Sequence, residues 1–476
     1  MNPPLRRIAI ACLVLFGLLL LNVNYIQAVQ ADDLRNHKGN ARVLLSEYDH
    51  ERGQIVVGGK AAAKSVPTED QLKYLRVYPK GKMYAPATGY YSLFGATGVE
   101  RAEDSILSGQ DSRLLVHRFI DLATGGKPKG GSVVLTLNAN AQRVAYQDLA
   151  GKTGAVVALN PQTGAILALA SRPSYDPNRL ASHESDKVKK AYKTLTHADD
   201  KPLLNRAIDQ TYPPGSTFKV ITSAAALSSG DYQPSTQIPA PHVLNLPQTT
   251  ATLNNFAGEV CSPTGRMSLA DALRMSCNTA FGDLGLRLGA KTVREQAEAF
   301  GVNDQFEIPM ETAKSVFPSG LDKPQTALSA IGQYNDRMTP LQMAMVASGI
   351  GNGGVVMKPY LVQEEKAPDL STIGQHTPHE YGRAVSPRVA DELKGMMELV
   401  VNQGTGTAAQ VPGVQVAGKT GTAQNAEGAQ PHGWFVAFAP ADNPKVAVAV
   451  VVKNGGQGGV VAAPIAKDVM EAVLRR

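Results

Sequence analysis

Three short segments of this 476-residue chain contain residue types that together could perform acyl transfer from a serine. Residues 216–219 (Ser-Thr-Phe-Lys) supply a hydroxyl and an amine, and residues 276–278 (Ser-Cys-Asn) supply a second hydroxyl and an amide. Residues 419–422 (Lys-Thr-Gly-Thr) add a cation, two hydroxyls and a glycine. Each segment alone is common. Their occurrence in this order predicts an active-serine enzyme, because a serine hydroxyl is a poor nucleophile without a base beside it.

The first segment places a candidate nucleophile, Ser216, three residues before a candidate base, Lys219. Residues 216–227 are rich in Ala, Ser and apolar types, which predicts a buried helix after the Pro-Pro-Gly of residues 213–215. On a helix the two side chains would share a face, and burial would weaken the preference of the amine for its charged form. For this tetrapeptide alone, a serine cap followed by a solvated lysine is the more common arrangement.

The second segment follows a predicted short helix. Residues 268–271 (Ser-Leu-Ala-Asp) have the pattern of an N-terminal cap, and the helix should end near Ser276. Asn278 would hold the lysine amine and a substrate amide, and Ser276 would relay a proton to the leaving group. Ser-x-Asn is a weak signal by itself, so its meaning depends on the other two segments.

The third segment suits the binding of a substrate carboxylate. Lys419, Thr420 and Thr422 offer a cation and hydroxyl donors, and Gly421 would let an edge strand approach a ligand closely. The same residues complete a match to the phosphate loop, because residues 413–420 fit Gly-x-x-x-x-Gly-Lys-Thr. A phosphate loop needs a buried strand before it and a helix after it, but both flanks are polar and glycine-rich. We therefore expect no nucleotide site.

The composition is that of a folded protein with two or three domains. Hydrophobic residues make up 43% and charged residues 18% of the chain. The net charge is +6, but the basic residues are scattered, which is weak support for a nucleic-acid partner and equally compatible with an anionic membrane or polymer. We therefore predict no nucleic-acid partner.

The N-terminus predicts a membrane segment. Arg6 and Arg7 precede an apolar run over residues 8–21, and Asp32 and Asp33 follow it, which places the N-terminus in the cytoplasm and the rest of the chain outside. A pure apolar run of this length also suits the core of a cleaved signal peptide, but a retained single-pass anchor is favoured.

Whether the cysteines can form a disulfide depends on this topology. Cys12 lies in the membrane segment, and Cys261 and Cys277 remain outside, where an isolated pair can form a disulfide. Two buried free thiols are an equally good reading of the sequence, because the geometry of the pair is not visible in it.

The pattern of strands and helices predicts three parts. Residues 1–31 form a short cytoplasmic tail and the anchor, residues 32–150 a membrane-proximal domain, and residues 151–476 the domain with the three segments. Strands are expected over 155–159 and 165–170, a hairpin, and over 434–439 and 446–452, a second hairpin, with helices from 339 and 386 between them. This predicts an α+β fold in which one antiparallel sheet, made from N- and C-terminal pieces, is covered by helices. The membrane-proximal domain shows no nucleophile–base spacing and no metal-ligand cluster, so we expect it to position the catalytic part.

Residues 154 onward resemble the transpeptidase domain of class B penicillin-binding proteins, and the whole chain is similar to the actinobacterial PbpA type of that family. The matching segments are residues 154–164, 212–219, 339–343 and 417–424. The N-terminal stretches 47–53 and 78–100 resemble the membrane-proximal domain of that type. The resemblance implies a penicilloyl-serine transferase fold, β-lactamase-like and α+β, with no cofactor and no metal.

The resemblance also implies a role for each candidate residue. Ser216 would attack the carbonyl between the two terminal D-alanines of a peptidoglycan stem peptide, with Lys219 as the base. Ser276 and Asn278 would move the proton and orient the amine. Lys419, with Thr420, Gly421 and Thr422, would form the carboxylate-binding strand, and the backbone N–H groups of Ser216 and Thr422 would form the oxyanion hole.

Partners follow from the same resemblance. An amine of a neighbouring stem peptide would take the acyl group and form the cross-link, and β-lactam antibiotics would acylate Ser216. The segment before residue 150 is too short for a glycosyltransferase domain, so a SEDS-family glycosyltransferase in the same membrane would polymerise the glycan. The type suggests a role in wall growth and cell division.

Three other functions were weighed. A serine β-lactamase shares the three segments but must hydrolyse its acyl-enzyme rapidly, and the sequence shows no base for that water. A β-lactam sensor would need a cytoplasmic signalling part, and only residues 1–7 precede the apolar run. A non-catalytic scaffold of the division or elongation machinery could keep the same segments without turnover.

Overall fold

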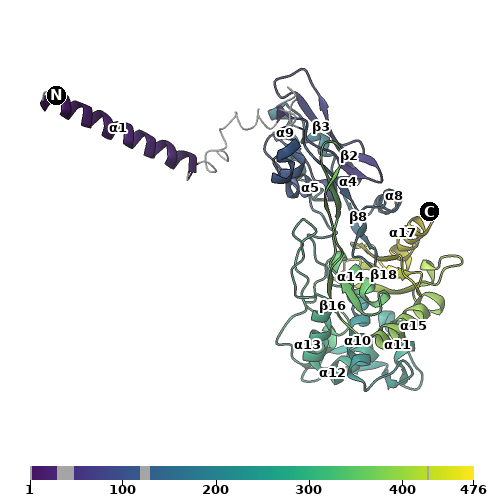
Figure 1. Cartoon of the computed structure of the whole chain (residues 1–476). Helices are drawn as coiled ribbons and strands as arrows, with labels where there is room; N and C mark the ends of the chain where they lie inside the picture. Colours follow the sequence, from purple (N-terminus) through teal and green to yellow (C-terminus); the bar gives the residue numbers. More distant parts are fainter. Residues whose placement is uncertain are drawn as a thin grey trace.

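The computed structural model describes residues 3–28, 30, 48–117, 119, 129–425 and 428–475. Figure 1 shows a separate N-terminal helix, an N-terminal part in purple and blue, and a larger part in teal to yellow that contains the C-terminus. We call the N-terminal part the pedestal and the larger part the catalytic region. Asp32 and Asp33, which were expected to follow the membrane segment, lie outside the described residues.

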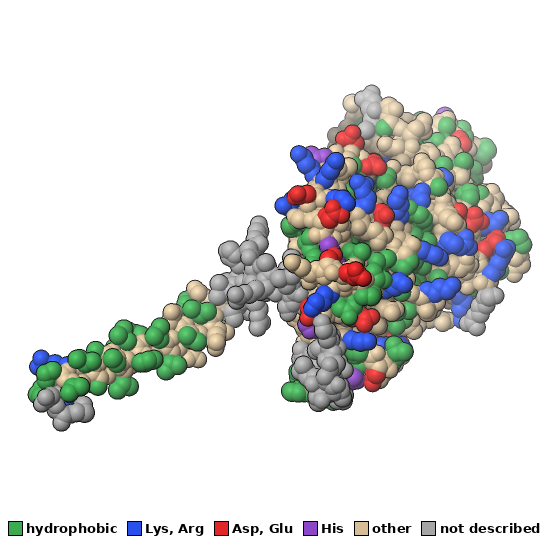
Figure 2. Space-filling model, turned by 90° about the horizontal axis from the view of Figure 1, so that it is seen from above, with side chains coloured by type: hydrophobic (Ala, Val, Ile, Leu, Met, Phe, Trp, Pro, Cys, Tyr) green, Lys and Arg blue, Asp and Glu red, His purple; other side chains and the backbone are tan. Residues whose placement is uncertain are grey.

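The N-terminal helix α1 (Pro3–Ala28) has the length and composition of a membrane span. Its segment Pro3–Gln27 has a mean hydropathy of 2.2, and its apolar window is not buried against the rest of the protein. Figure 2 shows hydrophobic side chains along this helix, and interspersed basic and acidic side chains on the displayed face of the body. An apolar helix that packs against nothing fits a lipid environment, and its orientation in a membrane stays a prediction.

A five-stranded antiparallel sheet forms the centre of the catalytic region. Its order is β17 (Ala417–Ala423), β18 (His432–Ala439), β19 (Val446–Val452), β7 (Gly154–Leu159) and β8 (Ile166–Arg172). The central pairing joins the last hairpin to the first, with Val450 opposite Val156. This confirms the predicted sheet made from N- and C-terminal pieces, and it leaves β17, which contains the Lys-Thr-Gly-Thr segment, at one edge.

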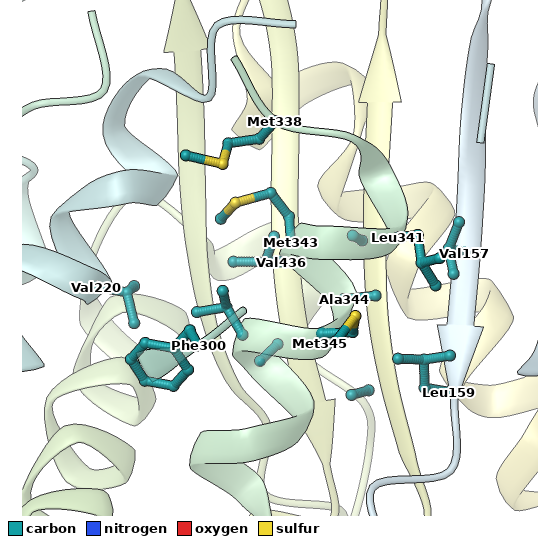
Figure 3. Close-up of a cluster of buried hydrophobic side chains, with 14 of the residues drawn as sticks. Val157, Leu159, Val220, Phe300, Met338, Leu341, Met343, Ala344, Met345 and Val436 are labelled. Carbon is teal, nitrogen blue, oxygen red and sulfur yellow. The ribbon is translucent and has the colours of Figure 1, made fainter. Parts of the chain in front are cut away.

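Helices cover both faces of this sheet, which is why its central strands are apolar at every position rather than at every second one. On one face α8 (Ala139–Asp148) and α17 (Ala463–Leu474) pack against the strands. On the other, α14 (Pro340–Gly351) lies across the sheet, and Figure 3 shows Met343, Met345 and Leu341 among Val157, Leu159 and Val436. The core thus holds the edge strand and the helices in a fixed relation.

The predicted helix starts are confirmed by their caps. The Thr339 hydroxyl accepts a hydrogen bond from the backbone N–H of Gln342 at 3.1 Å, and α14 begins at Pro340. The Ser386 hydroxyl caps α15 (Pro387–Gln403) in the same way through Val389 N–H. A side-chain acceptor for an otherwise unpaired N–H, followed by proline in the first turn, explains why these boundaries could be predicted.

The other elements of the catalytic region are short or peripheral, apart from the site helices described below. They are β9 (Gln237–Pro239), β10 (Val243–Asn245), β11 (Thr252–Asn254), η4 (Phe256–Gly258), β12 (Arg266–Ser268), α13 (Lys323–Ser329), β13 (Val355–Met357), β16 (Glu380–Arg383), η5 (Thr407–Ala409) and α16 (Gly458–Val461). By contrast, η2 (Pro177–Arg179) and α9 (Ser185–Thr196) lie with the pedestal, where Ala191 and Leu195 pack with Ala85 (Figure 1). β9 pairs with β12, β10 with β11, and β13 with β16, each antiparallel. These small sheets frame the helices around the site.

The pedestal contains a six-stranded sheet that uses strands from both halves of the chain. Its order is β15 (Thr372–Gln375), β14 (Val362–Lys366), β6 (Ser132–Leu135), β1 (Ile55–Val57), β2 (Lys60–Pro67) and β3 (Tyr74–Val77). Figure 1 shows the green strands running from the catalytic region into the pedestal. The division near residue 150 remains a prediction. The chain beyond that point nevertheless contributes β14 and β15 to the pedestal sheet.

The rest of the pedestal surrounds one buried carboxylate. The remaining elements are α4 (Gly81–Thr88), β4 (Tyr91–Ser92), β5 (Gly95–Ala96), α5 (Gly98–Ala102), α6 (Asp104–Leu107) and η1 (Ser112–Leu114). The fully buried Glu100 on α5 accepts hydrogen bonds from Arg52 Nε at 2.8 Å, Arg76 Nε at 2.6 Å and the Tyr78 hydroxyl at 3.0 Å. Because a buried charge needs partners, this cluster ties α5 to the segments of β1 and β3.

Candidate active site

The candidate nucleophile lies on a tight turn rather than inside a helix. Ser216 belongs to η3 (Gly215–Phe218), and α10 (Lys219–Ser229) begins three residues later, where one continuous helix from residue 216 was expected. Gly215 has a φ of +54°, and its N–H donates to the carbonyl of Gly332 at 2.9 Å. A glycine is favoured at this φ, so it fixes the turn and leaves the Ser216 side chain partly exposed.

Neighbouring elements brace the same turn. Trp434 Nε1 on β18 donates to the carbonyl of Pro213 at 3.0 Å, and the Thr217 hydroxyl donates to the carbonyl of Pro214 at 2.7 Å. A Cβ atom on Gly421 of β17 would lie 2.9 Å from Thr217 Cγ2 and 3.0 Å from the Pro214 oxygen. Gly421, expected to allow close approach of a ligand, therefore lets the edge strand pack against the serine turn.

The candidate base is fully buried and hydrogen-bonded to the second segment. Lys219 Nζ donates to the backbone oxygen of Ser276 at 2.6 Å and to Asn278 Oδ1 at 2.7 Å. A neutral amine would donate its two hydrogens to these acceptors, and its lone pair would remain for the third, longer contact, with Ser276 Oγ at 3.4 Å, or for another proton donor. Burial, and then the nearby charge of Lys419, lowers the pKa of Lys219 well below its usual value. The arrangement favours the neutral form, which is the form a base requires.

The described residues show no hydrogen bond from the Ser216 hydroxyl to Lys219 Nζ. The two side chains still belong to one turn of the chain, because α10 begins at Lys219 directly after η3. A proton from Ser216 would have to reach the lone pair that Ser276 and Asn278 leave unused. Contacts of this kind often shorten only when substrate is bound.

Ser276 lies between the two lysines. It follows α11 (Leu269–Met275), whose predicted N-cap Ser268 accepts from Asp271 N–H at 3.0 Å. Ser276 adopts a left-handed backbone conformation with φ 63° and ψ 39°, and its Oγ lies 3.4 Å from Lys219 Nζ and 2.9 Å from Lys419 Nζ. A positive φ is strained for a residue other than glycine. This conformation places both the backbone oxygen and the Oγ atom of Ser276 near Lys219 Nζ.

Lys419 is the second buried cation of the site. Its Nζ also donates to the backbone oxygen of Thr420 at 2.9 Å, and the residue is fully buried on the edge strand β17. Burial lowers the pKa of Lys419 to about 7. The Lys419 amine can therefore be neutral or protonated near neutral pH, and a bound anion would favour the protonated form.

The phosphate-loop match over residues 413–420 has no phosphate-loop geometry. Its last four residues lie in β17, which pairs with β18 so that Lys419 is opposite Val436. A phosphate loop would need a turn that wraps an anion and then a helix. The lysine and threonine are instead part of an extended strand.

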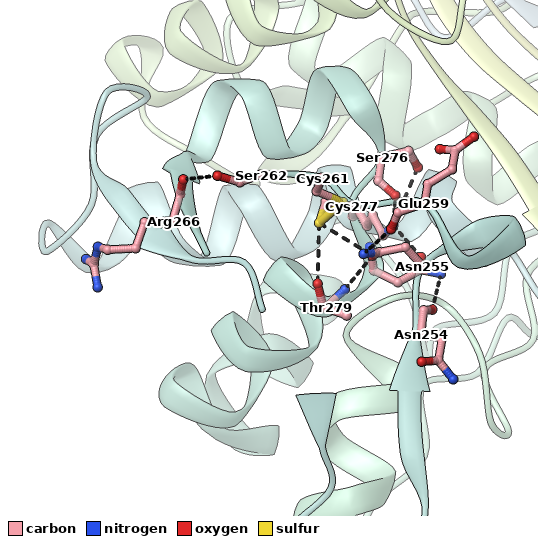
Figure 4. Close-up of a disulfide and its surroundings, with 11 residues drawn as sticks. Asn254, Asn255, Glu259, Cys261, Ser262, Arg266, Ser276, Cys277 and Thr279 are labelled. Atoms are coloured by element: carbon pink, nitrogen blue, oxygen red, sulfur yellow. Dashed lines mark hydrogen bonds between the residues drawn. A yellow bond between two sulfur atoms is a disulfide. The ribbon is translucent and has the colours of Figure 1, made fainter. Parts of the chain in front are cut away.

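Asn255 is a residue of this site that the sequence did not indicate. Its Oδ1 accepts from the backbone N–H groups of Asn278 at 2.8 Å and Thr279 at 3.0 Å, and its Nδ2 donates to the carbonyl of Glu259 at 3.0 Å (Figure 4). Asn255 thereby caps α12 (Asn278–Ala299), since Cys277 at the N-cap position makes no side-chain cap. A cap donated from 23 residues away leaves no local pattern to recognise.

We expect Asn255→Ala to lower the free energy of unfolding by about 1–2 kcal/mol, because two buried N–H groups lose their acceptor. Urea unfolding followed by circular dichroism measures this. The neighbouring Asn254→Ala is the control. The Asn254 side chain is exposed, and the oxygen that accepts from the Asn278 side-chain amide is the backbone oxygen of Asn254, which the substitution keeps. Equal stability of the two variants would show that the cap contributes little.

A disulfide joins the loop before α11 to the second segment. Cys261 and Cys277 are bonded, with Cα atoms 5.9 Å apart, and Figure 4 shows the bond beside Ser276 and Asn255. Cys12 in α1 is free and exposed. The bridge anchors the residue between Ser276 and Asn278 to a second part of the chain. Within the described residues, no group of His, Cys, Asp and Glu side chains could hold a metal ion.

The structure thus brings a partly exposed serine, two buried lysines and the hydroxyl between them to one edge of the sheet, an arrangement that suits acyl transfer from a serine. The family model described as the penicillin binding protein transpeptidase domain matches residues 154–471, and that of the penicillin binding protein A dimerisation domain matches residues 52–133. The chain belongs to the penicillin-binding protein transpeptidase family.

Similar proteins are found in mycobacteria and beyond. The chain is 47% identical to the peptidoglycan D,D-transpeptidase PbpA of Mycolicibacterium smegmatis, over 100% of this chain and 99% of that protein. It is 31% identical to MrdA of Escherichia coli K12, over 76% of this chain and 62% of that protein. The crystallised penicillin-binding protein A of Mycobacterium tuberculosis, as a ceftriaxone acyl-enzyme, matches with a TM-score of 0.88 and 45% identity, covering 91% of this chain and 100% of that one. These matches confirm the predicted family and α+β fold.

Proposed function

We propose that this protein is a peptidoglycan D,D-transpeptidase that cross-links stem peptides through an acyl-enzyme on Ser216. The observation that supports this most strongly is the Ser276 hydroxyl between two buried amines, Lys219 on one side and Lys419 on the other. The Lys219 amine, with its lowered pKa, can accept a proton while Lys419 binds an anion, and the Ser276 hydroxyl lies near both. Full-length similarity to D,D-transpeptidases of mycobacteria supports the same reaction.

In the first half-reaction, the Ser216 oxygen attacks the carbonyl carbon between the two terminal D-alanines. Lys219 takes the hydroxyl proton, and the carbonyl oxygen becomes an anion that the backbone N–H groups of Ser216 and Thr422 would bind. Such a donor often contributes about 3 kcal/mol of transition-state stabilisation. When the C–N bond breaks, Lys219 returns this proton through the Ser276 hydroxyl to the leaving nitrogen, and D-alanine departs, which leaves Lys219 neutral again.

In the second half-reaction, the amine of a neighbouring stem peptide attacks the ester carbonyl. Lys219 removes a proton from this nitrogen, the C–O bond to Ser216 breaks, and the serine oxygen regains a proton. The product is an amide between two stem peptides. Lys419 and the Thr420 hydroxyl would bind the carboxylate of the donor during the first half-reaction, and Asn278 would orient the substrate amide and Lys219.

β-Lactams would enter as analogues of the D-alanyl-D-alanine end. Opening of the lactam ring by Ser216 leaves an ester whose leaving nitrogen stays attached, so no product departs. The similar M. tuberculosis protein has been crystallised as penicillin G and imipenem acyl-enzymes. A β-lactamase would have to hydrolyse the same ester rapidly, and a scaffold would not form it.

Fluorescent penicillin labelling with a chase tests the proposal. The full chain should form a long-lived adduct, and Ser216→Ala should form none. Rapid loss of the label from the wild-type protein would indicate a β-lactamase. Failure of the wild-type protein to take up label would indicate a non-catalytic scaffold.

The rate of acylation should depend on the protonation states of both lysines. Lys219 must be neutral to accept a proton, and Lys419 must be charged to attract a carboxylate. Since the pKa of Lys419 is about 7, the second-order rate constant for benzylpenicillin should fall as pH rises above that value. Stopped-flow acylation between pH 5 and 9 measures this, on the order of a tenfold loss per unit once the group titrates. A rate constant that keeps rising to pH 9 would contradict the role of Lys419.

We also propose that α1 anchors the protein in the cell membrane with its N-terminus in the cytoplasm and the site outside. The apolar, unpacked helix and the arginines before it support this orientation. The family resemblance suggests a SEDS-family glycosyltransferase as membrane partner. Protease protection in spheroplasts tests the topology, and co-purification from detergent extracts tests the partner.

A further inference from the structure

Thr405 places a third hydroxyl at the edge of the site. It follows α15, in the glycine-flanked turn of residues 404–406, and is exposed. Its Oγ1 lies 2.5 Å from Thr420 Oγ1, and Thr420 Oγ1 lies 3.4 Å from Lys419 Nζ. Two hydroxyls and an ammonium therefore form one contiguous donor group on the open side of β17.

Close backbone contacts hold this hydroxyl in place. A Cβ atom on Gly404 would lie 2.5 Å from the backbone oxygen of Arg274 on α11, the helix that ends at Ser276. A Cβ atom on Gly459 of α16 would lie 2.6 Å from the backbone oxygen of Thr405. Thr405 N–H also donates to the Arg274 oxygen at 3.4 Å. The turn is thus packed between the helix of the second segment and the helix that follows the sheet.

The pair of hydroxyls leaves hydrogen-bonding capacity unused. In the Thr405–Thr420 pair one hydroxyl donates and the other accepts, so the accepting hydroxyl still has a hydrogen to give. A carboxylate can accept this hydrogen, and it can accept from both O–H groups if it replaces the bond between the two hydroxyls, while its charge faces the Lys419 ammonium. A neutral amide or ester would gain much less from the same donors.

We propose that Thr405 is a substrate-binding residue that donates, together with Thr420, to the terminal carboxylate of the stem peptide and of β-lactams. This inference rests on the proposed function and adds a residue to its carboxylate site. The competing explanation is that Thr405 only stabilises the turn of residues 404–406, in which case its loss would affect ligands with and without a carboxylate equally.

The test compares the acylation of Thr405→Val, Thr405→Ser and wild type by benzylpenicillin and by its methyl ester. Valine keeps the shape of threonine and removes the hydroxyl, whereas serine keeps the hydroxyl. We expect Thr405→Val to lower the second-order rate constant for benzylpenicillin about 10- to 100-fold, as for a lost hydrogen bond to a charged group, and to change that for the ester less than about twofold. Thr405→Ser should stay near wild type. Thr407→Val, exposed on the same loop, is the matched control.

Equal losses for both ligands, or no loss for benzylpenicillin, would overturn the inference. If Thr405→Val does not fold, as judged by its thermal midpoint, Thr405→Ala serves in its place with the same expected difference between ligands. Failure of the proposed function gives a different result: wild type and every Thr405 variant would then take up neither ligand, or Ser216→Ala would be acylated.

Discussion

Lys219→Met should slow the acylation of Ser216 by benzylpenicillin about a thousandfold while leaving the fold intact. A positioned general base typically contributes about 10²- to 10⁴-fold, and activation of a serine depends on it. Methionine matches the length of the buried lysine stem and can pack against Phe281, whose ring lies 5.6 Å from Lys219 Nζ. The loss would therefore report the missing amine rather than a cavity.

Stopped-flow acylation at pH 7.5 measures this loss, and thermal unfolding checks the fold. Lys291→Met on the exposed face of α12 is the matched control, since the same substitution there changes a solvated side chain. A Lys219→Met protein that is folded and acylated within tenfold of wild type would exclude Lys219 as the base.

Ser276→Ala should lower the acylation rate constant about a hundredfold, in the range expected for a proton relay. The substitution keeps the Cβ atom, so the left-handed backbone at this position gains no new strain, and the backbone oxygen can still accept from Lys219. It removes the one hydroxyl that lies near both amines, at 3.4 Å from Lys219 Nζ and 2.9 Å from Lys419 Nζ. The expected loss is smaller than for Lys219, because the base remains.

The same stopped-flow assay measures this variant. Ser229→Ala at the far end of α10 is the control and should be acylated like wild type, because the Ser229 hydroxyl donates to the carbonyl of Ala226 and accepts from Asp231 N–H, away from the site. An unchanged rate constant for Ser276→Ala would mean that the proton reaches the leaving nitrogen by another route.

Local chemistry explains the parts of the fold that the sequence could predict. Ser268, Thr339 and Ser386 each cap a helix through the N–H three residues on, and such patterns are visible in a few consecutive residues. The paired hairpins of the central sheet follow from apolar runs separated by turn residues. Their arrangement into one sheet followed from the need to cover apolar strands.

The features that the sequence did not predict depend on long-range contacts. β14 joins the pedestal sheet through its pairing with β6, more than 200 residues away in the chain, and β15 pairs with β14. No local pattern encodes such a register. Asn255 caps α12 from another loop for the same reason. The sequence also did not show that a Cβ atom on Gly421 would lie within 3.0 Å of Thr217 and Pro214, so that this glycine makes room for the serine turn.

The site itself was predicted only in part. The residue types of the three segments indicated the chemistry, and the structure brings Lys219, Ser276, Asn278 and Lys419 into one hydrogen-bonded cluster. The sequence could not show that Ser276 uses both its oxygens, because this depends on a left-handed backbone at the end of α11. Nor could the sequence show whether Cys261 and Cys277 form a disulfide or remain two buried free thiols.

Product analysis on stem peptides tests the central claim most directly. The purified full chain in detergent is mixed with a pentapeptide donor ending in D-alanyl-D-alanine and an acceptor peptide with a free amine, and the products are identified by mass spectrometry. We expect one D-alanine released for each new amide between donor and acceptor, a serine ester on Ser216 in trapped samples, and no product from Ser216→Ala. Only hydrolysed donor, or cross-linked product from Ser216→Ala, would contradict a transpeptidase that acts through Ser216.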